Sequence, residues 1–261
     1  MKIEINMKTI VLAAGYATRL YPLTENFPKP LLSIGKNTIL GRLLDDIDRI
    51  PDVTEHIIVT NAKFAMMFES WAELRKSKRG AKPITVLSDG TTTNETRLGA
   101  VRDLILAIET YNIDEDIMVL AADNILDFSL GEFVDEFNYT KTSMVMCYYE
   151  TEIYKLQRTG VIVIDDERRV MLMQEKPEVP MSHWAVPPFY IYHKADLPLI
   201  RTSIENGCGF DAPGNLAHYL VDNSVVHAWR MMGKRFDIGS LDTYEEAKTL
   251  FTDDKLPRWR R

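Results

Sequence analysis

A loop near the N-terminus combines small residues with two cations in a pattern suited to binding phosphate. Its small and hydroxyl-bearing residues include Ala13, Ala14, Gly15 and Thr18. Small side chains let backbone N–H groups approach phosphate oxygens closely. Arg19 can contact two oxygens with its forked guanidinium, and Lys29 adds a charge on a segment stiffened by flanking prolines. The loop therefore predicts a triphosphate cradle, with an ordinary strand-to-loop turn as the alternative.

Two carboxylates elsewhere in the chain suggest a divalent cation beside that cradle. Asp123 follows the apolar run IMVLAA, and Asp237 lies between two apolar residues near the end of the chain. A carboxylate at the end of a buried strand is costly unless it is paired or bound to a metal. Two carboxylates with phosphate oxygens and water are typical of Mg²⁺. The alternative is that Asp123 caps a helix and Asp237 pairs with Arg235 or Lys234.

The elements that must position these residues alternate in the first half of the chain. Short apolar runs predict strands at 9–13, 56–60, 84–87 and 117–121, with amphipathic helices at 38–50, 63–78 and 96–110. This alternation is typical of parallel βαβ units. Ligands in such sheets bind beyond the carboxyl ends of the strands, which is where the cradle and Asp123 fall.

The second half has fewer helices between its strands. We expect strands at 143–149, 161–165, 169–174, 189–192 and 225–229, helices at 196–205 and 215–221, a loop at 231–240 and a helix from residue 241. The predicted fold is α/β, with a Rossmann-like, mostly parallel central sheet flanked by helices. A small antiparallel addition follows in the second half.

Composition and charge exclude several classes of protein. Among 261 residues, 31 are Lys or Arg and 38 are Asp or Glu, which gives a formal charge of −7. Nucleic-acid-binding domains are usually basic, so we expect no nucleic acid as a partner. No apolar run reaches the ~18 residues of a membrane span, so we expect no membrane partner. The two cysteines form no disulfide framework, which favours a cytoplasmic location.

Both ends of the chain are expected to lie outside the core. Met7 is a second candidate start, so residues 1–6 are interpreted as an extension, and the basic tail at 255–261 is expected to fray. The oligomeric state stays open, with a homo-oligomer among the alternatives.

The run LAAGYATRLYPLTENFPKP resembles the signature of the sugar-1-phosphate nucleotidyltransferases, L-A-G-G-x-G-T-R-L-x-P-L-T followed by K-P. Ala14 and Ala17 depart from it, because the family has glycine at both positions. The Cβ of Ala17 makes the loop less adaptable than glycine would. Neither the P-loop pattern nor the dinucleotide fingerprint G-x-G-x-x-G occurs in this run.

Further segments resemble the family in the same order along almost the whole chain. They are Leu98-Gly99-Ala100, AADN at 121–124, Gly160, Glu175-Lys176-Pro177, the stretch 182–192 and FDIGS at 236–240. Asn94 stands where many relatives place a glutamine that reads the base. Pro188 replaces a family glycine.

The resemblance implies a role for each matched residue. Nucleotide binding falls to Ala13, Ala14, Gly15, Thr18, Asn94, Gly99 and Asp123. Acceptor binding falls to Gly160, Glu175, Lys176 and Tyr190, and Mg²⁺ to Asp123 and Asp237. Arg19, Lys29 and Lys176 are the implied catalytic residues. One nucleotidyltransferase domain is expected over 1–261, with the nucleotide half at about 7–125 and the sugar-phosphate half at about 126–261.

The implied reaction transfers a nucleoside monophosphate from an NTP to a sugar 1-phosphate and releases pyrophosphate. A phosphate monoester has a second pKa of about 6, so the nucleophile is already charged at pH 7 and needs no general base. Three alternatives stay open. They are a cytidylyltransferase acting on phosphocholine or a phosphonate, a non-catalytic nucleotide sensor, and a plain dinucleotide-binding protein, which the missing fingerprint disfavours. The base and the sugar are not determined.

Overall fold

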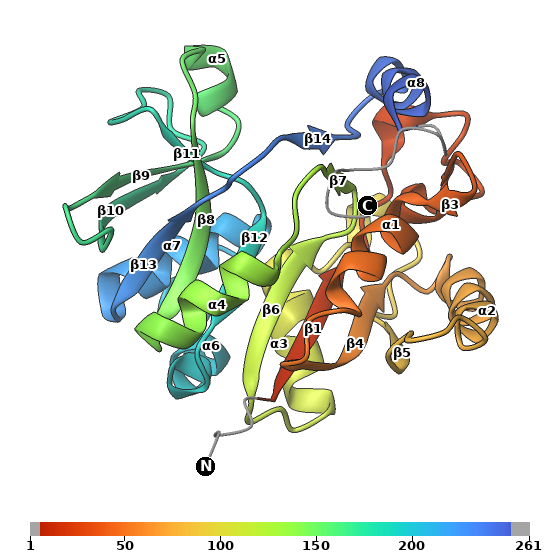
Figure 1. The fold of residues 1–261 in the computed structure, drawn as a ribbon, viewed down its shortest axis with the longest axis horizontal. Helices are drawn as coiled ribbons and strands as arrows, with labels where there is room; N and C mark the ends of the chain where they lie inside the picture. The colour runs from red at the N-terminus through yellow and green to blue at the C-terminus, as the bar shows by residue number, and fades with distance from the viewer. Residues whose placement is uncertain (1–5, 252–261) are drawn as a thin grey trace. The chain divides into compact units, whose positions relative to one another are not determined.

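The computed structural model describes residues 6–251. The interpretations of residues 1–5 and of the basic tail therefore concern segments outside the described residues. The chain has an α/β fold made of two compact units that are interleaved in the sequence (Figure 1). The first unit takes the chain up to residue 10, 98–120 and 133–231, and the second takes 11–97, 121–132 and the chain from 232 on. The expected functional division near residue 125 stays a prediction.

The first unit is built on a mixed sheet. Its strands are the start of β1 (Met7–Leu12), β6 (Asp116–Ala121), β8 (Ser143–Tyr149), β9 (Gly160–Ile164), β10 (Val170–Glu175), β11 (Trp184–Val186), β12 (Phe189–Tyr192) and β13 (Val226–Arg230). The order is β10-β9-β11-β8-β12-β6, and β13 pairs with β8. The pairs of β9 with β10 and with β11 are antiparallel, which confirms the predicted antiparallel addition.

Helices of the first unit pack on this sheet. They are α3 (Ala100–Thr110), most of α4 (Gly131–Thr140), α5 (Ile153–Leu156), α6 (Leu197–Thr202), which follows the short turn η4 (Lys194–Asp196), and α7 (Pro213–Asn223). The helix predicted from residue 96 begins only at Ala100, because Gly99 has a φ of 95° and cannot continue a helix.

The second unit holds the parallel pair β4 (Val53–Thr60) and β5 (Ile84–Ser88), beside the end of β1. Its helices are α1 (Ile39–Ile47), α2 (Ala65–Arg75) and α8 (Leu241–Leu250), with short turns η1 (Thr18–Leu20), η2 (Lys29–Leu31) and η3 (Asn94–Thr96). Two small antiparallel strand pairs complete it, β2 (Ser33–Ile34) with β3 (Asn37–Thr38) and β7 (Asn124–Leu126) with β14 (Arg235–Asp237).

Helix α1 shows how local chemistry sets these elements. The Thr38 side chain accepts a hydrogen bond from the Gly41 N–H at 2.9 Å and so caps the helix. The apolar stripe predicted from the sequence, including Ile39, Leu43 and Ile47, is buried. The stripe therefore anchors α1 to the core of the second unit.

One predicted loop is wrong. Residues 235–237 form β14, which pairs antiparallel with β7, whereas we expected the whole stretch 231–240 to be a loop. Strands β7, β11 and β14 have three residues each, which is too short for an alternating pattern to stand out. Long-range pairing, and not local propensity, creates them.

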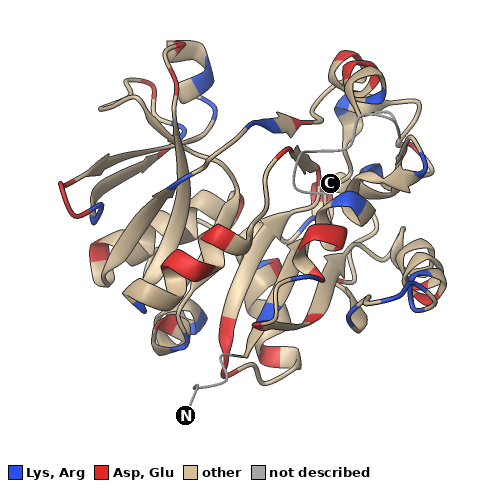
Figure 2. Cartoon of the chain, in the orientation of Figure 1, with Lys and Arg blue, Asp and Glu red and all other residues tan. Residues whose placement is uncertain are grey.

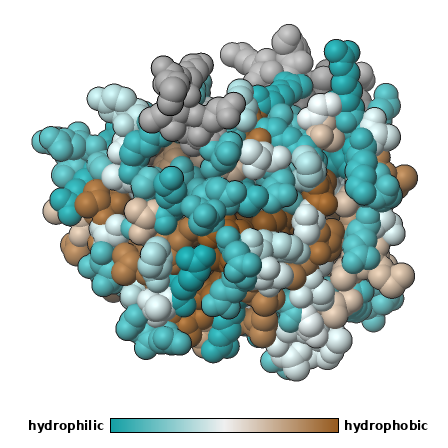
Figure 3. Space-filling view, turned by 90° about the horizontal axis from the view of Figure 1, so that it is seen from below, coloured by the Kyte–Doolittle hydropathy of each residue, from teal (hydrophilic) through white to brown (hydrophobic). Residues whose placement is uncertain are grey.

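The described residues contain no helix that is long and apolar enough to cross a membrane. On the face drawn in Figure 3, hydrophobic residues gather in areas that hydrophilic residues interrupt. The large apolar side chains that anchor the core, such as Phe64, Phe133 and Phe189, are fully buried.

Candidate active site

The predicted cradle lines a pocket in the second unit. The pocket has a volume of about 240 Å³, and its lining is Leu12, Ala13, Gly15, Ala17, Arg19, Lys29, Pro30, Ala121, Ala122 and Asp123. The structure thus brings the small residues, both cations and the first carboxylate together at the carboxyl ends of β1 and β6. Gly15, Thr18 and Arg19 are exposed there. A Cβ at Gly15 would meet nothing within 4 Å, so the backbone at this point is open to a ligand.

Buried polar groups hold the start of the cradle in place. The Ala13 N–H donates to the Val59 carbonyl at 2.8 Å. The fully buried Asn61 donates from Nδ2 to the Ala14 carbonyl at 3.0 Å, and its Oδ1 accepts from the Phe64 N–H at 3.1 Å. Asn61 is a site residue that the sequence reasoning missed. The available signal was an amide directly after the second parallel strand.

Ala17 adopts the conformation that the family glycine would take easily. Its φ of 48° and ψ of 40° lie in the left-handed region, which costs an alanine roughly 1 kcal/mol. The Ala17 carbonyl accepts hydrogen bonds from the Thr24 hydroxyl at 2.8 Å and from the Leu20 N–H at 2.9 Å. The turn therefore keeps its shape despite the Cβ, because its carbonyl is bound twice.

Lys29 and Asp123 form the centre of the site. The Lys29 ammonium donates to Asp123 Oδ2 at 2.6 Å and to the Ile238 carbonyl at 2.9 Å. Asp123 Oδ1 accepts from Asn124 Nδ2 at 2.7 Å, and Asn124 Oδ1 accepts from Arg235 at 2.6 Å. Asp123 is followed by β7 and not by a helix, so the alternative of a helix cap is wrong.

The pairing of β7 with β14 brings the second carboxylate to the first. Asp237 lies opposite Asn124 in this pair, and the Ile238 N–H donates to the Asp123 carbonyl at 3.1 Å. Figure 2 shows the basic and acidic residues on β14. Asp237 and Arg19 both lie beside Gly239, where a Cβ would be 3.8 Å from Asp237 Oδ2 and 3.9 Å from the Arg19 guanidinium.

The two carboxylates differ in their electrostatics. Burial acts to raise the pKa of Asp123, but Lys29 and Arg235 outweigh it and hold that pKa below its usual range. Desolvation by neighbouring protein atoms and the charge of Asp123 raise the pKa of Asp237. The cations Arg235, Lys29 and Arg19 act in the opposite direction. The charge of Asp123 thus disfavours ionisation of Asp237, and a bound cation would relieve this repulsion.

These residues fit a divalent cation that the substrate helps to bind. No group of three or more His, Cys, Asp or Glu side chains suited to a metal occurs within residues 6–251. Asp123 and Asp237 alone supply hard oxygen ligands, which suit Mg²⁺. Because Mg²⁺ usually keeps waters and shares phosphate oxygens, two carboxylates beside a phosphate cradle are sufficient.

The two predicted base-binding residues fall in different units. Asn94 lies on η3 of the second unit and is partly exposed. Gly99, in the first unit, has a structural role of its own. A Cβ there would lie 2.6 Å from the Phe210 carbonyl oxygen, and the next two N–H groups donate to the Asp211 and Phe210 carbonyls. The role of both residues toward a base stays a prediction.

The predicted acceptor residues gather in the first unit. Glu175 ends β10 and pairs in register with Gly160 on β9. Lys176 follows with a φ of 48°, and its side chain is exposed. Burial raises the pKa of Glu175, and Lys176 partly offsets this. A half-buried carboxylate next to an exposed ammonium suits a ligand with hydroxyls and a phosphate.

Tyr190 is less accessible than its predicted role requires. It is only 2% exposed, and its ring stacks on Tyr192 with centroids 5.8 Å apart. Phe189 is also fully buried. Contact between the Tyr190 side chain and a ligand stays a prediction.

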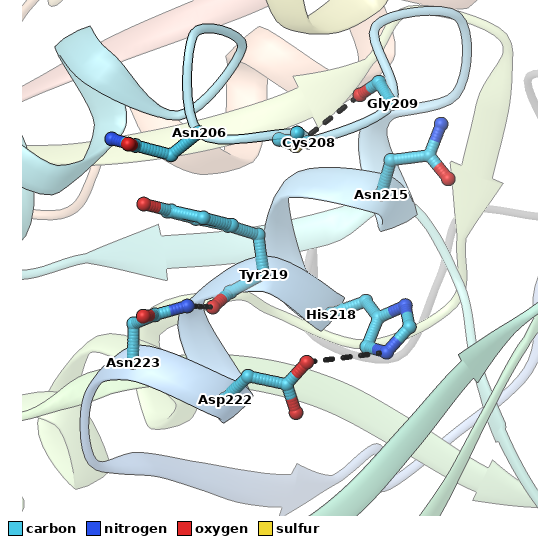
Figure 4. A pocket seen from close by; sticks show the side chains of 9 residues that line it. Asn206, Cys208, Gly209, Asn215, His218, Tyr219, Asp222 and Asn223 are labelled. Atoms are coloured by element: carbon cyan, nitrogen blue, oxygen red, sulfur yellow. Dashed lines mark hydrogen bonds and ion pairs between the residues drawn. The ribbon is translucent and has the colours of Figure 1, made fainter.

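A second pocket lies in the first unit, along one face of α7. Its volume is about 550 Å³, and its lining is Asn206, Gly207, Cys208, Gly209, Asn215, His218, Tyr219, Asp222 and Asn223 (Figure 4). His218 pairs with Asp222 at 3.5 Å, and Asn223 donates to the Tyr219 carbonyl at 2.7 Å. None of the predicted site residues lines it.

Comparison with known proteins agrees with this geometry. The model of the family described as nucleotidyl transferase matches residues 8–254, so the chain belongs to that family. UTP–glucose-1-phosphate uridylyltransferase AglF of Haloferax volcanii is 27% identical over 93% of this chain and 95% of the relative. Glucose-1-phosphate adenylyltransferase of Fervidobacterium nodosum is 28% identical over 92% of this chain and 60% of the relative.

Solved structures show the same fold. A UDP-glucose pyrophosphorylase in complex with UDP-glucose has a TM-score of 0.78 at 21% identity, covering 94% of this chain and 98% of that one. A structure described as a putative glucose-1-phosphate thymidylyltransferase of Bacillus anthracis has a TM-score of 0.76 at 23% identity, covering 95% of this chain and 96% of that one. Both the predicted α/β fold class and the predicted family are confirmed.

Proposed function

We propose that the chain is a sugar-1-phosphate nucleotidyltransferase, which converts an NTP and a sugar 1-phosphate to an NDP-sugar and pyrophosphate. The observation that carries the proposal is the pocket in which Arg19, Lys29 and Asp123 face a loop of small residues, with Asp237 brought beside Asp123. Relatives that act on glucose 1-phosphate with UTP or bear the name adenylyltransferase support the reaction class and leave the base open.

In this proposal the chain works mainly by positioning and by stabilising charge. A charged oxygen of the acceptor phosphate attacks the α-phosphorus, and pyrophosphate leaves. Arg19 binds the β- and γ-phosphates and stabilises the charge that develops on them. Lys29, which neutralises Asp123 in the structure described here, is the second cation available to the triphosphate. Lys176 holds the acceptor phosphate, and Glu175 accepts hydrogen bonds from sugar hydroxyls.

Mg²⁺ would be held by Asp123 and Asp237. When bound, such an ion neutralises phosphate charge and orients the reacting groups. Asp237 pairs in register with Asn124, which directly follows Asp123, so both proposed ligands belong to the second unit.

A sugar acceptor fits the aromatic residues better than phosphocholine does. A quaternary ammonium is usually held in an aromatic cage. Phe189, Tyr190 and Tyr192 are at most 2% exposed, so they offer no cage to a ligand. The ring of Trp184 already has the Arg230 guanidinium at 5.6 Å from its centroid, which repels a second cation.

The test is a pyrophosphate-release screen of the five common NTPs against hexose and heptose 1-phosphates, with phosphocholine included. We expect turnover with at least one sugar 1-phosphate and a lower kcat/KM with phosphocholine. A clear preference for phosphocholine would reassign the acceptor. Tight NTP binding without turnover on any acceptor would favour the nucleotide sensor.

We also infer a cytoplasmic location. Both cysteines are free and buried, and burial raises the pKa of Cys147 to about 12, so this thiol does not form a thiolate readily. Free cysteines and an NTP substrate both suit a reducing cytoplasm.

A further inference from the structure

The Glu175 carboxylate sits in a slot between two glycines. A Cβ at Gly214, in the first turn of α7, would lie 1.9 Å from Glu175 Oε2 and 2.6 Å from its Cδ. A Cβ at Gly160 would lie 3.3 Å from the same oxygen. The carboxylate therefore occupies the space that a side chain at Gly214 would need.

Because of this contact, a substitution at Gly214 should move the Glu175 carboxylate without lowering the stability of the fold. The three atoms nearest to a Cβ at Gly214 all belong to the end of the flexible Glu175 side chain. A methyl group at residue 214 would therefore swing the carboxylate away and leave the backbone in place. Alanine is also a better helix former than glycine by about 1 kcal/mol, so α7 itself would not suffer.

The slot matters because it fixes a half-buried acceptor. Burial raises the pKa of Glu175, and this burial comes from elements that meet at the carboxylate, namely β9, β10 and the start of α7. A carboxylate held in one orientation binds ligand hydroxyls with higher affinity than a mobile one, because less conformational entropy is lost on binding.

We propose that Gly214 is a positioning residue for the acceptor. By carrying no side chain, it leaves the slot in which the Glu175 carboxylate is oriented toward the sugar hydroxyls. This inference rests on the proposed function, in which Glu175 binds the sugar.

The experiment compares Gly214→Ala with Gly131→Ala. Gly131 also lies in the first turn of a helix, but a Cβ there would meet only the Ser129 hydroxyl, at 3.4 Å. We expect G214A to raise the KM for the accepted sugar 1-phosphate by about tenfold, the cost of one weakened hydrogen bond to a charged group. The KM for NTP and the melting temperature should stay near wild type, and G131A should change none of them.

A second pair of variants tests whether Gly214 acts through Glu175. If it does, G214A adds nothing in an E175A background, so E175A and the double variant should share one KM for the sugar 1-phosphate. A merely structural role for Gly214 would instead raise KM further in the double variant. A crystal structure of G214A should show the carboxylate displaced.

The possible outcomes distinguish a failure of the Gly214 proposal from a failure of the proposed nucleotidyltransferase function. An unmoved carboxylate in the G214A crystal overturns the inference whatever the activity. An unchanged KM in G214A, with a raised KM in E175A, overturns it as well and leaves the proposed function standing. Wild-type KM in E175A removes the sugar-binding role of Glu175 and the inference with it. Absence of pyrophosphate release by the wild type with every sugar 1-phosphate overturns the proposed function itself.

Discussion

Asp123 and Asp237 are the two carboxylates proposed to hold the divalent ion, so loss of either charge should change activity more than folding. We expect Asp123→Asn or Asp237→Asn to lower kcat by about a hundredfold or more, because each variant loses an anionic ligand for the divalent ion. Steady-state pyrophosphate release, with circular dichroism to confirm folding, measures the effect. Asp222→Asn, at an exposed carboxylate outside the cradle, is the matched control. Near-wild-type turnover in both site variants would remove the metal assignment.

Arg19 is exposed in the cradle pocket, which leaves its guanidinium available to a ligand. Arg19→Ala should slow turnover by about a hundredfold, since one stabiliser of transition-state charge is worth ~3 kcal/mol or more. Arg79→Ala removes an exposed guanidinium beyond the end of α2 and should leave turnover unchanged. Equal rates for the two variants would mean that the loop is not the phosphate site.

Lys29 neutralises Asp123, so its removal should make stability depend on metal. The side chain of Lys29 is 10% exposed and that of Asp123 is 30% exposed, which places the pair between a surface and a buried one. We expect Lys29→Met to cost about 1–3 kcal/mol of unfolding free energy. Added Mn²⁺ should recover part of this loss, because an ion that binds only the folded state stabilises it. Urea unfolding with and without Mn²⁺ tests both statements, and equal responses of variant and wild type would contradict them.

At the scale of elements, a buried ion network joins α1, β4 and α2. His56 on β4 is fully buried, and its Nε2 lies 3.0 Å from Asp48 Oδ1. Arg75 contacts Asp48 at 2.7 Å and Asp45 at 2.9 Å. A carboxylate only accepts hydrogen bonds, so His56 Nε2 carries the proton. Burial lowers the pKa of His56, although Asp48 acts against it, so the ring stays neutral in the folded chain.

This network predicts a loss of stability in mild acid. The unfolded chain binds a proton on His56 with a pKa of about 6.5, whereas the folded chain resists it to lower pH. The unfolded state therefore gains protons first as the pH falls below about 6.5. Wild-type unfolding free energy should drop between pH 7.5 and 5.5 by more than that of His56→Gln. Urea titrations at the two pH values measure the difference, and parallel losses would exclude His56 as the cause.

At the scale of the whole molecule, the compact units divide most of the predicted residues by ligand, and Gly99 is the exception. The cradle, Asp123 and Asp237 belong to the second unit, whereas Gly160, Glu175 and Lys176 belong to the first. Asp237 belongs to the second unit although it lies far beyond residue 125, because the chain returns to this unit at residue 232. The short strand β14 attaches the end of the chain to the second unit by pairing with β7, and this pairing joins residues far apart in the sequence.

The division predicts that the two substrates can be weakened separately. Lys176→Ala should raise the KM for the sugar 1-phosphate by about tenfold, since it removes one charged contact to phosphate. The Kd for NTP, measured by calorimetry without acceptor, should not change. A weaker NTP affinity in this variant would show that Lys176 also serves the nucleotide.

The sequence by itself determined the family, the fold class and most of the longer elements. Strands β8 and β12 match their predicted ranges, because buried runs and alternating residues leave a clear local pattern. The cradle could be predicted for the same reason, since Gly15, Thr18 and Arg19 lie within five residues of one another. Neighbours in sequence remain neighbours in space, so their chemistry can be interpreted without a structure.

Tertiary structure decided the contacts between residues far apart in the chain. Lys29 meets Asp123 across 94 positions, and Asn61 supports Ala14 across 47. Gly214 faces Glu175, and nothing in either local sequence indicates it. Two single residues also differ from what their type predicts. Tyr190 is buried, and Ala17 has a left-handed backbone conformation. Such contacts depend on the packing free energy of the whole fold, which cannot be inferred from any short stretch of sequence.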